Sequence, residues 1–137
     1  MKAELQKQLY EKYPKIFVDR DKDMTQSCMF WGIETGDGWY TLIDTVCWTI
    51  QSYIDNNSSE TRPIPQVVAE QVKEKFGTLR FYARGGNDMT GGMTWFAESM
   101  SSTICEQCGK PGKTNNGGWL VTLCAEHRKE DDYELET

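Results

Sequence analysis

The sequence is poor in the groups that most catalytic and membrane functions need. It contains a single histidine, His127, so a nucleophile–base pair with a free imidazole cannot be assembled if that residue binds a metal. No run of about 18 apolar residues is present, and the charged N-terminus shows no signal-peptide pattern. No repeat of about 20–50 residues is visible. We therefore expect neither a membrane span nor a secreted or repetitive protein.

Basic residues are also scarce, since 15 Lys and Arg face 21 Asp and Glu for a net charge of −6. Residues 126–137 contain six acids and two bases and carry −4, so the other 125 residues carry −2. Binding to bulk DNA depends on clustered Lys and Arg that release counterions. The charge balance therefore disfavours nucleic acid and favours a small ligand or a protein as the partner.

Four metal-ligating residues near the C-terminus form the strongest motif. Cys105 and Cys108 are separated by two residues, as are Cys124 and His127, and fifteen residues lie between the pairs. Tetrahedral zinc takes four nitrogen or sulfur ligands from pairs spaced in this way. Gly109 follows the second thiol, where such a turn often requires a positive φ. We predict a zinc ribbon over 105–127, against the alternatives of metal-free thiols or disulfides.

The predicted zinc is structural. Four donors complete the coordination sphere, whereas catalytic zinc keeps an open position. The His-x-Glu order of zinc deaminases and the HExxH helix of metalloproteases are both absent. Two further cysteines, Cys28 and Cys47, remain; they could pair, but we expect free buried thiols in a reducing cytosol.

An amphipathic helix over 39–55 is the clearest element of the remaining chain. Its apolar residues follow the i, i+3, i+4, i+7 rule. A second helix, with a narrower apolar face, is predicted over 3–13. Residues 78–84 alternate as a strand, and we prefer a hairpin over a helix for 66–84. We expect strands at 28–34 and 119–123, loops at 18–27 and 85–93, and a helix over 94–104 capped by Thr94.

These elements predict an α+β fold in one domain. A small antiparallel sheet packs on one main helix in a core formed by 1–104, followed by the zinc ribbon at 105–127 and an acidic tail at 128–137.

Two groups of residues are candidates for ligand binding. Arg80, Tyr82 and Arg84 share one face of the predicted strand, where guanidinium groups and an aromatic ring suit a phosphate and a base. Asp37 and Trp39 lie in the Gly36–Trp39 turn (GDGW) at the start of the main helix, where amide groups favour an anion. The alternatives are a solvated strand face paired with Glu70 and Glu74, and an N-cap at Asp37 with Trp39 in the core.

Tryptophan is frequent, with five residues in the chain. Trp48 lies off the apolar stripe of the main helix, so it is expected either at a partner interface or beneath the N-terminal helix. Unburied tryptophans would favour self-association, and a homo-oligomer is one expected state.

Several segments together resemble a family of small, uncharacterised proteins encoded in bacteriophage and prophage genomes. They are Val72–Tyr82 (VKEKFGTLRFY), Ala97–Ser101 (AESMS), Cys105–Gly109 (CEQCG), Gly118 with Trp119, and Cys124 with His127. The resemblance implies a phage origin and a setting in the host cytoplasm, where some accessory genes counter host immunity.

The expected function is a non-enzymatic, zinc-stabilised binding protein of phage type. It would act as an anti-defence factor that sequesters a nucleotide-like signal or binds a host immune protein. The alternatives are a zinc-ribbon regulator that binds nucleic acid and an enzyme of unknown class.

Overall fold

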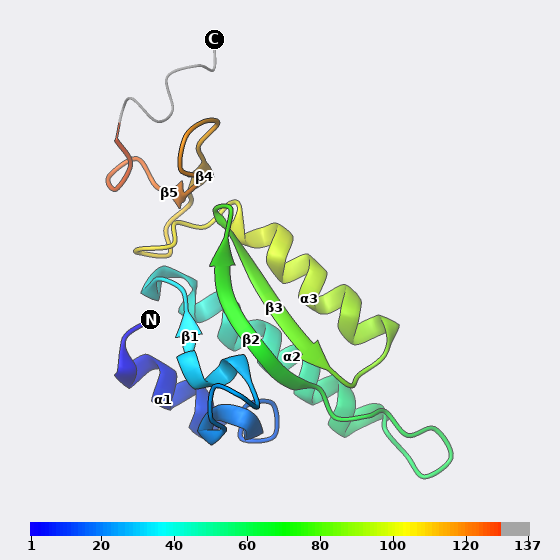
Figure 1. The fold of residues 1–137 in the computed structure, drawn as a ribbon. Helices are drawn as coiled ribbons and strands as arrows, with labels where there is room; N and C mark the ends of the chain where they lie inside the picture. Colours follow the sequence, from blue (N-terminus) through cyan, green and yellow to red (C-terminus); the bar gives the residue numbers. More distant parts are fainter. Residues whose placement is uncertain (130–137) are drawn as a thin grey trace.

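The computed structural model describes residues 1–129 and shows an α+β fold (Figure 1). Its helices are α1 (Ala3–Lys12), α2 (Tyr40–Asn57) and α3 (Asp88–Ser101), and its strands are β1 (Ile33–Glu34), β2 (Val68–Lys75), β3 (Thr78–Arg84), β4 (Lys113–Thr114) and β5 (Thr122–Leu123). Short 3-10 helices cover Val18–Asp21, Cys28–Trp31 and Asp37–Trp39. The helices at 3–13 and 39–55 and the hairpin at 66–84 are thus confirmed.

The main sheet is mixed rather than antiparallel, which corrects the sequence prediction. Its order is β1-β2-β3, with β1 parallel to β2 and β2 antiparallel to β3. Helix α2 lies between β1 and β2 in the chain. A helical crossover of this kind returns the chain to the end of the sheet where β1 began, so that the two strands run parallel. The β2–β3 hairpin closes through the two residues Phe76 and Gly77.

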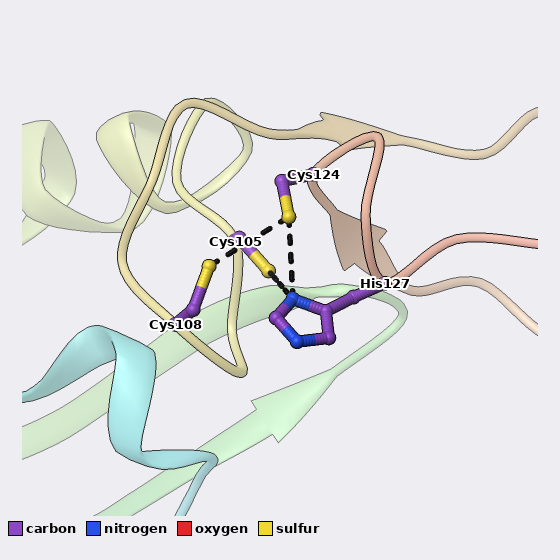
Figure 2. Close-up of side chains that lie close together, drawn as sticks. All are labelled: Cys105, Cys108, Cys124 and His127. Carbon is purple, nitrogen blue, oxygen red and sulfur yellow. Dashed lines mark hydrogen bonds between the residues drawn. The ribbon is translucent and has the colours of Figure 1, made fainter.

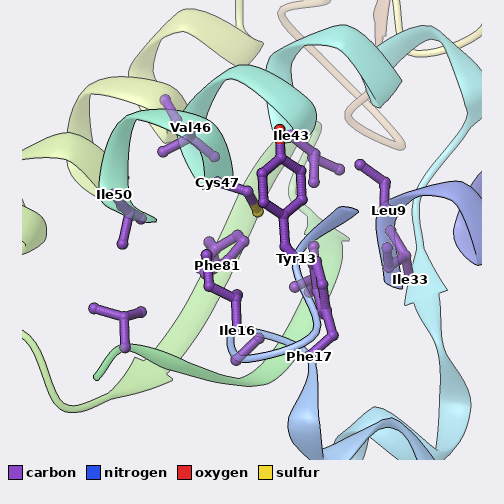
Figure 3. Packing of buried hydrophobic residues seen from close by; sticks show 14 of the residues in the cluster. Leu9, Tyr13, Ile16, Phe17, Ile33, Ile43, Val46, Cys47, Ile50 and Phe81 are labelled. Atoms are coloured by element: carbon purple, nitrogen blue, oxygen red, sulfur yellow. The ribbon is translucent and has the colours of Figure 1, made fainter. Parts of the chain in front are cut away.

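The hydrophobic core lies between α2, the sheet and the N-terminal segment (Figure 3). Helix α2 buries Ile43, Val46, Cys47, Ile50 and Ile54, the stripe that its periodicity predicts. Burial raises the pKa of the Cys47 thiol, so this cysteine is a packing residue. Cys28, in contrast, is exposed, so the expectation that it is buried was wrong.

Helix α3 begins six residues earlier than predicted, inside the segment expected to be a Gly-rich loop. Asn87 caps it: its side chain accepts from the Thr90 N–H at 3.1 Å, and the Thr90 hydroxyl accepts from the Asn87 N–H at 2.9 Å. This reciprocal cap replaces the one predicted at Thr94. The exposed Gly91 and Gly92 weaken the helix without breaking it.

Two predicted strands are shorter in the structure. Within 28–34 only Ile33 and Glu34 form a strand, because Cys28–Trp31 winds into a 3-10 helix that ends at Gly32 with φ 72°. Within 119–123 only Thr122 and Leu123 pair, with Lys113 and Thr114. Residues 130–137, most of the predicted acidic tail, lie outside the described residues. Within 1–129, none of the helices has the length and apolar character that crossing a membrane requires.

Candidate metal centre

The four predicted metal ligands converge on one point near the C-terminus (Figure 2). Sγ of Cys108 lies 3.6 Å from Sγ of Cys124, and Nδ1 of His127 lies 3.7 Å from Sγ of Cys105 and 3.2 Å from Sγ of Cys124. All four ligand atoms lie within 4.8 Å of one another. Zinc–sulfur and zinc–nitrogen bonds of about 2.3 and 2.0 Å give tetrahedral edges of roughly 3.5–3.8 Å, so the donor set fits a tetrahedral metal ion.

Two tight turns present these ligands. In the first, the Gly109 N–H donates to the Cys105 carbonyl at 2.9 Å, and Gly109 has the positive φ predicted for it, 81°. In the second, the His127 N–H donates to the Cys124 carbonyl at 3.1 Å. The short β4–β5 hairpin connects the turns and brings the second pair back to the first.

Backbone amides favour thiolates at two of the three cysteines. Burial opposes ionisation of Cys105, but N–H groups from Cys124, Cys108 and Gln107 outweigh it and lower the pKa of the thiol. At Cys124 burial also opposes ionisation, and the N–H of Glu126 and contacts with Cys108 and His127 lower the pKa. The N–H of Lys110 lowers the pKa of Cys108, but loss of solvation and the neighbouring sulfurs of Cys105 and Cys124 together outweigh it, so this pKa is raised. A divalent cation would relieve this repulsion.

The GDGW turn is the surface on which the first metal turn docks. The Gly38 N–H donates to the Glu106 carbonyl at 2.7 Å, and the Gly36 N–H donates to the Glu106 carboxylate at 2.9 Å. A Cβ at Gly38 would lie 2.2 Å from the Cys105 carbonyl oxygen, so only glycine permits this approach. Burial raises the pKa of the Glu106 carboxyl, although the Gly36 N–H favours its charged form.

The two candidate ligand residues of this turn have structural partners. Trp39 is fully buried, and its indole Nε1–H donates to the Ile104 carbonyl at 2.8 Å. Asp37 does not cap α2; its carboxylate accepts from the Lys2 N–H at 2.8 Å. The alternative placement of Trp39 in the core is therefore confirmed, and the predicted N-cap at Asp37 was wrong.

Arg80, Tyr82 and Arg84 lie on the β2–β3 hairpin but differ in their partners. The Arg84 guanidinium donates to the buried carboxylate of Asp19 at 2.6 and 3.2 Å, which lowers the pKa of that carboxyl, and lies 4.0 Å from Glu70. Arg80 donates to the Thr78 hydroxyl at 3.0 Å. Arg84 is thus part of the fold, whereas Arg80 and Tyr82 remain on the solvent side of β3.

Strand β2 adds two lysines that the sequence reasoning did not single out. Lys73 pairs with Arg80 and Lys75 pairs with Thr78 in the hairpin register. Their alternation with the buried Val72 would have identified them, had 66–75 been firmly assigned as a strand. The outer hairpin face, defined here as Lys73, Lys75, Arg80 and Tyr82, therefore carries three cations and one phenol.

A second exposed surface is apolar. Trp48 on α2 and Trp95 and Phe96 on α3 are 62, 74 and 68 % exposed, so Trp48 is not covered by α1. A shallow groove of about 230 Å³ lies between the two helices, and its lining includes Leu42, Met93 and Phe96. Helix α3 buries the small residues Thr90, Ala97 and Ser101, whereas its rings face solvent.

Comparisons of the chain with family models, with curated proteins and with solved structures found no match. Its function is therefore inferred from the geometry of its own residues.

Proposed function

We propose that this chain is a non-enzymatic binding protein, stabilised by a structural zinc ion in a C-terminal zinc ribbon, that binds a small anionic, nucleotide-like ligand on its outer hairpin face. The observation that carries the proposal is a pair of like charges. Lys73 stands directly opposite Arg80 in the antiparallel register. Such a pair destabilises a sheet by itself, and a bound anion would offset the repulsion.

The electrostatics of the outer hairpin face support an anion as the ligand. Within residues 1–129, Lys73, Lys75 and Arg80 form no ion pair with an acid, although Glu34 of β1 lies beside Lys73 in the parallel register. Arg84, in contrast, is neutralised by Asp19. Tyr82 is 43 % exposed between these cations and the end of the strand. Guanidinium and ammonium groups beside a free aromatic ring match a phosphate attached to a planar base.

The donor set supports zinc in a structural role. Three thiolates and one imidazole favour zinc over magnesium or calcium, and four protein ligands leave no position for a substrate. Glu126, the carboxylate next to His127 in sequence, is ion-paired with Lys110 at 3.0 Å. Elemental analysis should find about one zinc per chain, and Cys108→Ser should lose the metal together with the fold of 105–127. A folded, metal-free wild-type protein would contradict this assignment.

Charge reversal tests the ligand surface. Isothermal titration with pyrophosphate and a panel of nucleotides should detect binding to the wild-type protein, and Arg80→Glu should abolish it. Lys15→Glu is the matched control, because Lys15 is exposed, lies outside the hairpin and undergoes the same change in charge. Equal affinity in wild-type and Arg80→Glu proteins would refute the proposal, as would no binding of any anion.

A protein partner is the second candidate, supported by the exposed aromatic residues on α2 and α3. Large apolar side chains left exposed in this way are typical of protein interfaces. The resemblance to phage proteins suggests a host immune protein as the partner and an anti-defence role in the host cytoplasm. Light scattering should first establish whether the surface pairs two copies of this chain. This candidate would be excluded if the protein is a monomer at all concentrations and binds no host protein. It would also be excluded if Trp95→Asp leaves any observed association unchanged.

A further inference from the structure

The tip of the β2–β3 hairpin carries an aromatic residue in an unfavourable conformation. Phe76 has φ 53° and Gly77 has φ 83°, as in a two-residue turn with two left-handed residues. Asn, Asp and Gly are preferred at the first position, and Phe76 is the single non-glycine residue with positive φ within 1–129. Its ring is 66 % exposed, with the Lys75 ammonium 5.6 Å from its centroid. Neither backbone preference nor core packing explains a phenylalanine here.

A second exposed ring lies nearby, on the β4–β5 loop. Trp119 is 84 % exposed, yet its backbone is held firmly. The side chain of the buried Asn115 donates to the Trp119 carbonyl at 2.8 Å and to the Gly117 carbonyl at 3.1 Å, and it accepts from the Val121 N–H at 3.0 Å. The loop therefore has a defined shape that presents the indole to solvent.

These two rings line one cleft of about 640 Å³, together with Lys73 and Lys75. The acid in its lining, Glu74, accepts from the Gly77 N–H at 2.7 Å and so supports the turn. The cleft adjoins the outer hairpin face, because Lys73 belongs to both and stands opposite Arg80. Aromatic faces and cations thus meet at the same end of the hairpin.

The β4–β5 hairpin fixes how the two rings are placed. The buried hydroxyl of Thr122 donates to the Gly77 carbonyl at 2.6 Å and lies 2.6 Å from the Thr114 hydroxyl. A Cβ at Gly77 would lie 3.2 Å from both Thr114 and the Val121 nitrogen, so the turn sits against the β4–β5 backbone. In Figure 1 the tip of the green hairpin reaches the orange β4–β5 segment. The cleft is therefore a fixed feature of the fold.

We infer that this cleft binds a nucleobase, which stacks on Trp119 and Phe76 while its phosphate lies on Lys73, Lys75 and Arg80. The inference rests on the proposed anion-binding function and adds the base as the group that is recognised. Aromatic rings stack on any base, and cations beside them hold the backbone phosphate. A free nucleotide and a single-stranded oligonucleotide present the same chemistry.

Two substitutions remove one ring each with little effect on the fold. Phe76→Asn creates the Asn-Gly sequence preferred in this turn, so the variant should be at least as stable as the wild-type protein. Trp119→Ala removes a ring that is already in solvent. Trp48→Ala, on the opposite, helical side, is the control for loss of an exposed tryptophan.

The test compares AMP with ribose 5-phosphate, which lacks the base. The wild-type protein should bind AMP about tenfold or more tightly than ribose 5-phosphate, and this ratio should fall towards one in Phe76→Asn and Trp119→Ala but not in Trp48→Ala. Equal affinities in the wild-type protein, or an unchanged ratio in both variants, would overturn the inference while leaving anion binding intact. Loss of binding to both compounds in Arg80→Glu tests the proposed function separately.

An oligonucleotide distinguishes the two sources of the base. A deoxyadenosine octamer that binds much more tightly than AMP, with an affinity that falls steeply with salt, would identify single-stranded nucleic acid as the ligand. AMP binding equal to or tighter than octamer binding would identify a free nucleotide. Either result supports the inference if Phe76→Asn and Trp119→Ala weaken the binding. The inference is overturned if neither AMP nor the octamer binds at low salt.

Discussion

Gly38→Ala should separate the first metal turn from the surface on which it docks. The added Cβ would lie 2.2 Å from the Cys105 carbonyl oxygen and 2.6 Å from both the Cys108 nitrogen and the Glu106 carbonyl carbon. All three are backbone atoms, so no side chain can rotate away. Ordinary contacts begin near 3.5 Å, so the metal turn must move by roughly 1 Å.

The expected loss of stability follows from these contacts. Overpacking costs about 1–3 kcal/mol, and loss of the hydrogen bond from Gly38 to Glu106 costs about 1 kcal/mol more. The reduced freedom of the unfolded chain returns about 0.4–1 kcal/mol. We expect a net destabilisation of about 1–3.5 kcal/mol. If the metal turn undocks locally, zinc affinity should instead fall roughly 5- to 400-fold.

Urea unfolding at saturating zinc, followed by tryptophan fluorescence, measures the first quantity, and competition with a zinc chelator measures the second. Gly92→Ala is the matched control, because nothing lies within 4 Å of a Cβ at that exposed position in α3. It should stabilise the protein by up to about 1 kcal/mol. A Gly38→Ala protein within about 0.5 kcal/mol of wild type, with the same m-value and zinc affinity, would refute the docking geometry.

Three further predictions concern single contacts. Arg84 lowers the pKa of the buried Asp19 carboxyl, so their interaction stabilises the fold above the unfolded pKa of about 3.9 and is lost as pH falls through the folded pKa. The difference in unfolding free energy between wild type and Asp19→Asn, measured by urea unfolding, should therefore shrink on acidification. A constant difference would contradict this. Trp39→Phe should lose about 1–3 kcal/mol in thermal unfolding, because it leaves the Ile104 carbonyl without its indole donor and opens a cavity. Thr122→Val should lose a similar amount and speed amide exchange at Gly77, whereas unchanged exchange would show that the Thr122 hydroxyl does not hold the hairpin tip.

Local patterns predicted the elements whose residues obey one clear period. The stripe on α2 and the alternation of β3 each follow from the chain itself, and the spacing of Cys105, Cys108, Cys124 and His127 predicted a convergence that the structure has. These predictions hold because each depends only on residues that are close in sequence, within one helix, one strand or one ligand pair.

What the sequence reasoning missed depends on contacts between distant segments. The parallel pairing of β1 with β2 requires the α2 crossover, and the hydrogen bond of the Trp39 indole requires the Ile104 carbonyl 65 residues away. The start of α3 was hidden because Gly91 and Gly92 resemble a loop, while the decisive Asn87–Thr90 cap is a weaker signal. The cationic partners of Arg80 became visible only through the register that places Lys73 opposite it.

The contacts of the β4–β5 hairpin and its ligand turns affect the order of folding. Hydrogen bonds join Gly36 to Glu106 across 70 residues, Trp39 to Ile104 across 65, and Gly77 to Thr122 across 45. During synthesis the first two-thirds of the chain would leave the ribosome before any of these partners exists. Closing such long loops is slow, so the segment 105–127 should join late and complete the core rather than fold as a detachable module. A protein ending at residue 104 would lack the Glu106 carbonyl that accepts from Gly38 and the Thr122 hydroxyl that donates to Gly77 at the hairpin tip. In the full chain, zinc binding would therefore coincide with the last step of folding.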